Sequence, residues 1–144
     1  MLNATTAGRE EFRAEATFAI RRDQAPQVRR WVRALRRLPA GVRADLELAV
    51  SEFFSNCVRH SRGGRVVVGV QCAPGTVRLW VTDPGSDAPA AAPAARLPHP
   101  LALDGRGLCL VGAVCSRWGL DIGTTLTRAW CEVPAAPGPE GRLR

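Results

Sequence analysis

Hydrophobic and polar positions follow two periods along the chain, and each period predicts one type of element. Over residues 15–22 the two kinds of residue alternate weakly, with Phe18 and Ile20 on one face, which predicts a first strand. Over residues 25–38 and 42–60 apolar residues recur every three or four positions, which predicts two amphipathic helices. The chain therefore begins with a strand followed by two helices.

A strand pattern with one interruption fills the middle of the chain. Residues 65–72 and 76–82 are rich in β-branched residues, and a turn signal over residues 73–75 separates them, so a β-hairpin is expected. Residues 84–100 are mostly Ala and Pro, which predicts a long loop. A loop of this length in a compact domain usually serves a function or is disordered.

The last third of the chain predicts one more helix and two more strands. The helix is expected over residues 104–118 and opens with Gly-Arg-Gly. Strand signals follow over residues 120–122 and 126–133, on either side of a turn at Gly123.

Length and composition fit a single globular domain. The chain has 144 residues, of which 46% are hydrophobic and 23% are charged. A chain of this size buries about 68–70% of its unfolded surface and needs no disulfide or metal to be stable. We expect an N-terminal tail at residues 1–13, one domain at residues 14–134 and a C-terminal tail at residues 135–144.

Neither targeting nor membrane signals are visible, and the cysteines show no metal-binding pattern. The N-terminus lacks the apolar core of a signal peptide, and no run approaches the ~18 apolar residues of a membrane span. The five cysteines form no CxxC pair, and four of them lie in apolar runs, where a free cysteine acts as a small hydrophobe. We therefore expect a cytoplasmic protein.

The formal charge of +7 comes from 20 basic residues, all of them arginine, against 13 acidic ones. Nucleic-acid binding is one interpretation of such a charge. The absence of lysine, which binds phosphate well, favours instead the amino-acid drift of a GC-rich genome. The excess of arginine lies mainly in the half that carries the first predicted helix. That helix face is either solvated or a docking face for an acidic protein partner.

Candidate chemistry begins in the second predicted helix and at the end of the hairpin. Glu52 and Asn56 lie four residues apart and so share a helix face. A carboxylate there can deprotonate a hydroxyl, and an amide oxygen can ligate Mg²⁺, although two unrelated polar residues on a solvated face would look the same. Asp83 ends a strand and Gly85 follows it. An acid at this place can accept a hydrogen bond from a ligand amino group, although Asp-Pro-Gly is also a strong turn signal.

Two more motifs follow in the last third. The segment from Asp104 to Leu108 sets two glycines before a helix, where exposed backbone N–H groups form an anion site to which Arg106 adds charge. A flexible hinge is the alternative. Thr127 opens the last strand, where it can hold a bound water, although threonine is also common in strands.

Together, the runs ELAVSEFFSNCVRHS, VTDPG, GRGLCLVGAVCSRWG and TRAWCEV resemble the GHKL ATPase family. More narrowly they resemble the stand-alone anti-sigma-factor serine/threonine kinases of the RsbW-like type. The resemblance covers about residues 18–133. It implies a Bergerat-type ATP-binding fold, an α/β (α+β) two-layer sandwich in which a mixed, mainly antiparallel sheet is covered on one face by three helices.

The resemblance also implies roles for single residues. Glu52 matches the general base, Asn56 the magnesium ligand, and Asp83 the acid that reads the adenine amino group, with Gly85 as its companion. The Ala/Pro stretch, about residues 84–105, corresponds to the ATP lid. The box that closes over the phosphates is matched by Gly105, Arg106, Gly107 and Leu108.

The last box of the family departs from its usual pattern here. Thr127 matches its threonine, with Thr125 as a rival, and Leu126 stands where a glycine usually precedes that threonine. The only histidines, His60 and His99, lie at a predicted helix end and in a predicted loop, and no dimerisation helix carries a phosphoacceptor histidine. A two-component sensor kinase is therefore disfavoured.

The function implied by the resemblance is that of a bacterial transcription regulator. It would use ATP and Mg²⁺ to phosphorylate a serine or threonine of an anti-sigma-factor antagonist, with a sigma factor as the competing partner and a homodimer as the assembly. The departure at Leu126 motivates an alternative. In that alternative the protein is a non-catalytic partner-switching module with a vestigial ATP site, which sequesters a sigma factor or another regulator. Direct binding to nucleic acid or to a membrane is not expected.

Overall fold

A computed structural model describes residues 12–39, 41–85 and 111–135. The elements, in chain order, are β1 (Phe12–Ala19), the 3-10 turn η1 (Arg22–Gln24), α2 (Ala25–Ala34), α3 (Arg43–His60), β2 (Arg65–Ala73), β3 (Thr76–Asp83), β4 (Arg117–Ile122) and β5 (Thr127–Pro134). Residues 111–114 are also helical. Within these residues, no helix has the length and apolar character needed to cross a membrane.

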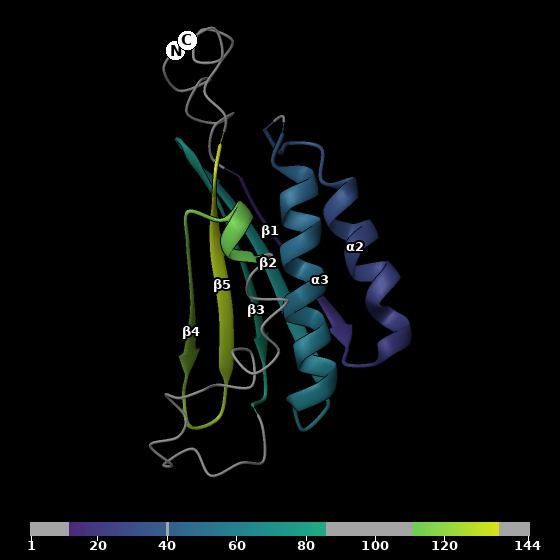
Figure 1. Ribbon diagram of the computed structural model, residues 1–144. Helices are drawn as coiled ribbons and strands as arrows, with labels where there is room; N and C mark the ends of the chain where they lie inside the picture. The colour runs from purple at the N-terminus through teal and green to yellow at the C-terminus, as the bar shows by residue number, and fades with distance from the viewer. Residues whose placement is uncertain (1–11, 40, 86–110, 136–144) are drawn as a thin grey trace, which may run out of the picture.

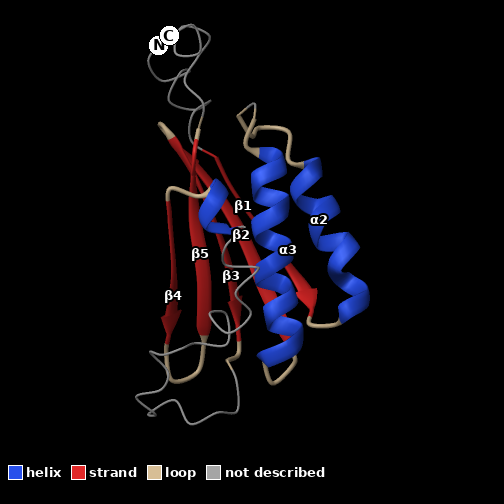
Figure 2. Ribbon diagram, in the orientation of Figure 1, coloured by secondary structure: helices blue, strands red, loops and turns tan. Residues whose placement is uncertain are grey.

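The five strands form one sheet in the order β1-β2-β3-β5-β4, and every neighbouring pair is antiparallel. Figure 1 shows α2 and α3 side by side on one face of this sheet, with the helical turn of residues 111–114 in front of β5. The same separation into a helical layer and a strand layer is clear in Figure 2. The expected α+β two-layer architecture is therefore confirmed. The sheet was expected to be mixed and mainly antiparallel, and among the described residues it is antiparallel throughout.

The core lies between the sheet and the two long helices. Alternate strand residues point to the helices, so that Val68 of β2, Leu79 of β3 and Cys131 of β5 are fully buried. Helix α3 contributes Phe53 and Phe54 from its broad apolar face. This layer fixes α3 against the central strands, which is what positions the site described below.

The other face of the sheet is built around two tryptophans that lie over glycines. Trp80 and Trp130 are direct cross-strand partners, Gly69 pairs with Trp80, and Gly119 pairs with Trp130. A Cβ on Gly69 would lie 2.1 Å from the Trp80 ring, and one on Gly119 would lie 2.6 Å from the Trp130 ring. The indole rings therefore occupy the space that a side chain at Gly69 or Gly119 would need.

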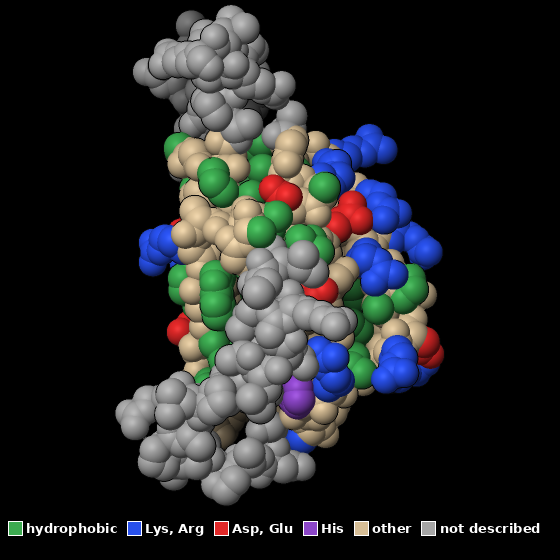
Figure 3. All heavy atoms as spheres, viewed as in Figure 1, with side chains coloured by type: hydrophobic (Ala, Val, Ile, Leu, Met, Phe, Trp, Pro, Cys, Tyr) green, Lys and Arg blue, Asp and Glu red, His purple; other side chains and the backbone are tan. Residues whose placement is uncertain are grey.

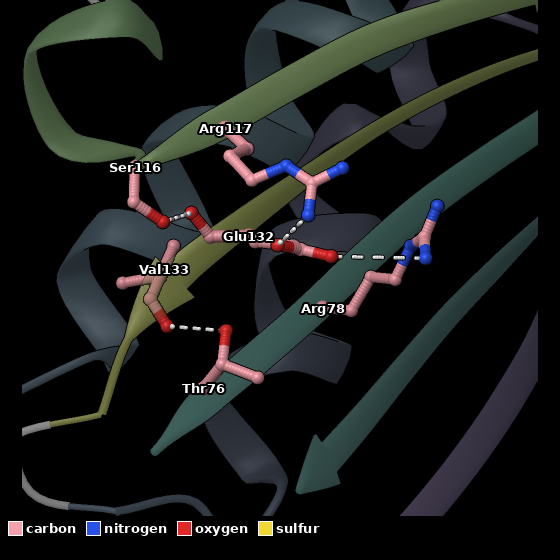
Figure 4. A network of polar contacts seen from close by, with 6 residues as sticks. All are labelled: Thr76, Arg78, Ser116, Arg117, Glu132 and Val133. Carbon is pink, nitrogen blue, oxygen red and sulfur yellow. Dashed lines mark hydrogen bonds and ion pairs between the residues drawn. The ribbon is translucent and has the colours of Figure 1, made fainter.

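Arginines and one glutamate complete this open face. The Arg13 guanidinium lies 4.9 Å from the centre of the Trp80 ring, and the Arg78 guanidinium lies 4.5 Å from that of Trp130, distances typical of cation–π contacts. Figure 4 shows Glu132 between Arg78 and Arg117, with carboxylate–guanidinium distances of 3.7 and 3.6 Å. Because these residues lie on three neighbouring strands, the contacts link β3, β5 and β4.

Replacing Gly69 by alanine is expected to destabilise the fold by about 1–3 kcal/mol, because the new methyl group would displace the buried Trp80 ring. The free energy of unfolding measured by urea denaturation checks this. The matched control is Gly112→Ala, where a Cβ meets nothing closer than 4.0 Å. The double variant Gly69→Ala/Trp80→Leu should recover part of the loss. Equal stability of Gly69→Ala and the wild type would contradict the packing described.

The first strand and the first helix are displaced from the expected ranges. The strand is found at Phe12–Ala19 rather than over residues 15–22, because the chain bends at Ile20. There the Arg21 N–H donates back to the Ala19 carbonyl at 2.9 Å, and the 3-10 turn starts at Arg22. The helix expected to reach residue 38 ends at Ala34, where Leu35 becomes extended. Leu38 still joins the core, but through a turn rather than through helical continuation.

The third predicted helix, residues 104–118, is wrong at its C-terminal end. Residues 104–110 lie outside the described part of the chain, and the helix ends at residue 114. The Ser116 N–H and hydroxyl both donate to the Glu132 carbonyl, at 2.8 and 3.1 Å, which starts the pairing of β4 with β5. Arg117–Ile122 is consequently a strand, and only its last part was expected as one.

Candidate functional site

The candidate site lies where β3 ends and β5 begins, beneath the C-terminal half of α3. Asp83 is the last residue of β3 and pairs with Thr127, the first residue of β5. Both continue the alternation that faces the helical layer. The sheet therefore brings together two of the predicted site residues that are far apart in the sequence.

Both oxygens of the Asp83 carboxylate accept hydrogen bonds within the protein. The Gly85 N–H donates to Oδ1 at 2.5 Å, and the Cys57 thiol donates to Oδ2 at 3.1 Å. Asp83 is only 9% exposed, and with Asn56 it is one of two buried polar or charged residues in the described part of the chain. Buried polar groups are stable when they are hydrogen-bonded in this way.

Gly85 adopts a backbone conformation that favours glycine, with φ +89°. Its N–H thereby turns back to the carboxylate of Asp83. A Cβ at this position would lie 3.6 Å from the Thr127 hydroxyl oxygen, so Gly85 and Thr127 border the same space.

The loop after α3 holds Gly85 in place. The Gly85 carbonyl accepts hydrogen bonds from the Arg62 N–H at 2.9 Å and from the Ser61 hydroxyl at 3.4 Å. A Cβ on Gly64 would lie 3.5 Å from the Pro84 ring. These contacts join the end of α3 directly to the segment after β3 and hold Gly85 in position beside Asp83.

Asn56 presents a buried oxygen that has no partner among the described residues. Its Nδ2 donates to the Glu52 carbonyl at 2.8 Å, one helical turn earlier, while its Oδ1 is buried and accepts nothing. An unsatisfied buried acceptor costs about 1–3 kcal/mol. Such a cost fits an atom that accepts from, or coordinates, a bound group.

The chemistry of Asn56 Oδ1 fits Mg²⁺, which takes oxygen ligands and usually keeps few protein contacts. In the described part of the chain no three His, Cys, Asp or Glu side chains gather into a metal site. In nucleotide sites Mg²⁺ is usually held by one or two protein oxygens together with phosphates and water, and Asn56 Oδ1 would serve as one such ligand.

Glu52 lies one turn before Asn56 on α3 and is half-buried. Its carboxylate forms no hydrogen bond or salt bridge with any described residue, whereas Glu47 on the same helix is paired with Arg33 at 2.9 Å. The Glu52 carboxylate is therefore not committed to a structural contact among these residues.

Cys57 is a site residue that sequence analysis missed. Its place in the helical apolar pattern made it a core residue, and it does pack in the core. Burial, and then the charge of Asp83 beside it, raise the pKa of the Cys57 thiol, so the thiol keeps its proton and acts as a donor. The available signal was its position directly after Asn56.

Some of the predicted site residues lie outside the described part of the chain. The structure also distinguishes between Thr125 and Thr127, the two candidates for the last box. Residues Gly105, Arg106, Gly107 and Leu108 lie outside the described residues, as does all of the lid range except Pro84 and Gly85. Thr125 lies in the exposed bend between β4 and β5, whereas Thr127 lies opposite Asp83.

Comparisons with known proteins agree with this fold. The family model described as "Histidine kinase-like ATPase domain" matches residues 18–127. No curated protein matches the chain. A crystal structure of the RsbU and RsbW domains of Rv1364c from Mycobacterium tuberculosis is similar, with a TM-score of 0.64, 22% sequence identity and 88% of this chain covered. The match covers 33% of that longer chain.

Proposed function

The chain belongs to the histidine kinase-like ATPase family, and from this membership we propose that it binds ATP with Mg²⁺ and phosphorylates a partner protein on serine or threonine. The observation that carries the proposal is the buried, unpartnered Oδ1 of Asn56, on the helix that also contacts Asp83. In this proposal α3 contributes to the phosphate end of the nucleotide site, and the end of β3 contributes to the base end.

Asp83 is proposed to read the adenine base. Its carboxylate is buried at the edge of the helical layer and retains lone pairs that can accept from the adenine amino group. Gly85 lacks a side chain, so the base can approach the backbone, and the Thr127 hydroxyl borders the same space. Thr127 is preferred to Thr125 as the threonine of the last box, because it lies opposite Asp83.

The phosphate end is assigned to Asn56 together with the predicted box of Gly105, Arg106, Gly107 and Leu108. Asn56 would hold Mg²⁺ through Oδ1, and the bound ion would neutralise charge on the phosphates. The backbone N–H groups of the box, with Arg106, would bind the phosphates.

Glu52 is proposed as the general base. It takes the proton of the partner's serine or threonine hydroxyl, the hydroxyl oxygen forms a bond to the γ-phosphorus, and the bond to ADP breaks. Such transfer relies mostly on positioning and on charge neutralisation. The uncommitted carboxylate of Glu52, one turn from Asn56, fits this task.

The partner is proposed to be an anti-sigma-factor antagonist, with a sigma factor as the competing partner, a homodimer as the assembly and the bacterial cytoplasm as the location. The description of the similar structure as RsbU and RsbW domains supports a partner-switching role. Arginine side chains gather along the side of the molecule where α2 lies (Figure 3), which offers a positive face to an acidic protein.

A non-catalytic binding module is the second candidate. Leu126, which replaces the usual glycine of the last box, is 54% exposed, and its carbonyl accepts a hydrogen bond from Gly123 in the β4–β5 turn. In this alternative the protein sequesters its partner, and the ATP site binds nucleotide without transfer.

Calorimetric titration with ATP, in Mg²⁺ and in EDTA, tests the site. Wild type is expected to bind ATP more tightly with Mg²⁺, and Asn56→Ala should lower the Mg²⁺-dependent part of the affinity about 10-fold or more. The control Gln71→Ala changes an exposed residue of β2 and should behave as wild type. A folded wild-type protein that binds no ATP would contradict the proposal.

Transfer of radiolabel from the γ-phosphate of ATP to an antagonist from the same genome separates the two candidates. Labelled serine or threonine on the antagonist supports the kinase. Tight ATP binding without transfer to any antagonist supports the binding module.

A further inference from the structure

Cys57 makes the only hydrogen bond that joins the Asp83 carboxylate to the helical layer, among the contacts of the described residues. The Gly85 N–H that occupies Oδ1 comes from the same chain segment, two residues further on, whereas the Cys57 thiol that occupies Oδ2 comes from α3. One donor therefore moves with Asp83, and the other fixes the carboxylate relative to α3.

The residue directly before Cys57 is Asn56, and Glu52 lies one turn earlier on the same helix. A rigid helix keeps these three positions at constant separation. The contact between the Cys57 thiol and Asp83 consequently sets the distance from the Asp83 carboxylate to Asn56 and Glu52, the residues proposed for the phosphate end. Cys57 is 5% exposed and Asp83 is 9% exposed, so water does not compete freely for this contact.

We propose that Cys57 is a positioning residue that orients Asp83 for the adenine amino group, so that the thiol contributes to the selection of adenine over other purines. The inference rests on the function proposed above, since it assumes that a nucleotide occupies this site. It adds a residue that touches no ligand and acts through the Asp83 carboxylate.

The contact predicts a specific defect when the donor is removed. Without the thiol, the carboxylate keeps one fixed oxygen and can rotate about it, so the second oxygen is no longer held toward the base. The loss should affect a nucleotide with an exocyclic amino group more than one without it. A packing defect would weaken both nucleotides equally.

The experiment measures Kd by calorimetry for ATP and for purine riboside triphosphate, which lacks the exocyclic amino group. Wild type is expected to prefer ATP by about 10–100-fold, the range of a hydrogen bond to a charged group. Cys57→Ala should lower this preference by about 3–10-fold, mostly by weakening ATP, since the remaining hydrogen bond is less well oriented.

Two further variants separate positioning from packing. Cys57→Ser keeps a donor and should restore the preference to within about twofold of wild type, because a hydroxyl donates as a thiol does. Cys72→Ala removes an equally buried thiol, 4% exposed on β2, and should leave the preference unchanged. Thermal unfolding of each variant reports the cost in stability separately.

An unchanged preference in Cys57→Ala, or equal weakening of both nucleotides, would overturn the inference while leaving the ATP site intact. A wild-type protein that binds both nucleotides equally would overturn the assignment of Asp83 and with it the role of Cys57. A wild-type protein that binds neither would overturn the proposed function itself.

Discussion

Replacing Glu52 by glutamine is expected to lower the rate of phosphoryl transfer to the antagonist by about 10²–10⁴-fold, the range of general-base catalysis. Glutamine has nearly the same shape as glutamate but cannot take the proton of the attacking hydroxyl. Because the Glu52 carboxylate makes no hydrogen bond or salt bridge with the described residues, ATP affinity should stay within about threefold of wild type. Single-turnover transfer from labelled ATP measures the rate without interference from product release.

The control for this variant is Glu47→Gln on the same helix. Glu47 is paired with Arg33 at the surface of the α2–α3 pair, away from Asn56 and Asp83. The control should therefore transfer phosphate at the wild-type rate. Undiminished transfer by Glu52→Gln would contradict the role of Glu52 as the base, and loss of ATP affinity in that variant would move its role to nucleotide binding.

Replacing Asp83 by asparagine is expected to raise the Kd for ATP by about 10²-fold or more. The change affects one of the internal hydrogen bonds to the carboxylate and also the proposed hydrogen bond from the adenine amino group. The amide has one acceptor oxygen and one NH₂ group, so either the Gly85 N–H or the Cys57 thiol must face another donor. The bond from the adenine amino group to a carboxylate is also lost. Calorimetry with ATP measures the combined effect.

Inosine triphosphate, which carries an oxygen where adenine carries its exocyclic amino group, gives a second measurement of base recognition by Asp83→Asn. The new NH₂ group can donate to that oxygen, so inosine triphosphate should bind the variant relatively better than it binds wild type. The control is Asp121→Asn, a change at an exposed residue of the edge strand β4. ATP binding by Asp83→Asn within threefold of wild type would contradict the assignment of the adenine end, since a lost bond to a carboxylate costs more than that.

The fold could be predicted largely because its elements have unambiguous periods. The predicted range for α3, residues 42–60, differs from the observed Arg43–His60 by a single residue, and the hairpin of β2 and β3 lies where the β-branched runs predicted it. These segments bury one face or stripe, so apolar spacing alone reports their contacts. The strand order, with β5 between β3 and β4, was not predicted, because it depends on pairing between segments that are far apart in the sequence.

The misplaced elements are those in which tertiary contacts outweigh local preference. Gly119 interrupts any strand pattern in β4, yet it is the residue over which the Trp130 ring lies. Leu38 kept the helical spacing of the first helix, although the chain reaches the core there through a turn. Neither partner is close in sequence, so no local signal could have shown these contacts.

The site divides in the same way. Glu52 and Asn56 share a helix, so their relation could be read from their spacing. The contact between Cys57 and Asp83 joins residues on a helix and on a strand, and the sequence offered only apolar periodicity for Cys57. A side chain that both packs in the core and donates a hydrogen bond is assigned by pattern to the first of these roles alone.

Asp83 pairs with Thr127, so the central strands β3 and β5 close the whole segment from Pro84 to Leu126 into one loop. This closure costs conformational entropy before the pairing contacts are gained, so β5 is expected to join the sheet after the local hairpin of β2 and β3 has formed. The cost grows only slowly, by about 0.6 kcal/mol for each doubling of loop length. Evolution can therefore lengthen or shorten the chain between Gly85 and Val111, ahead of β4, with little loss of stability, while the strand ends that carry Asp83 and Thr127 stay together.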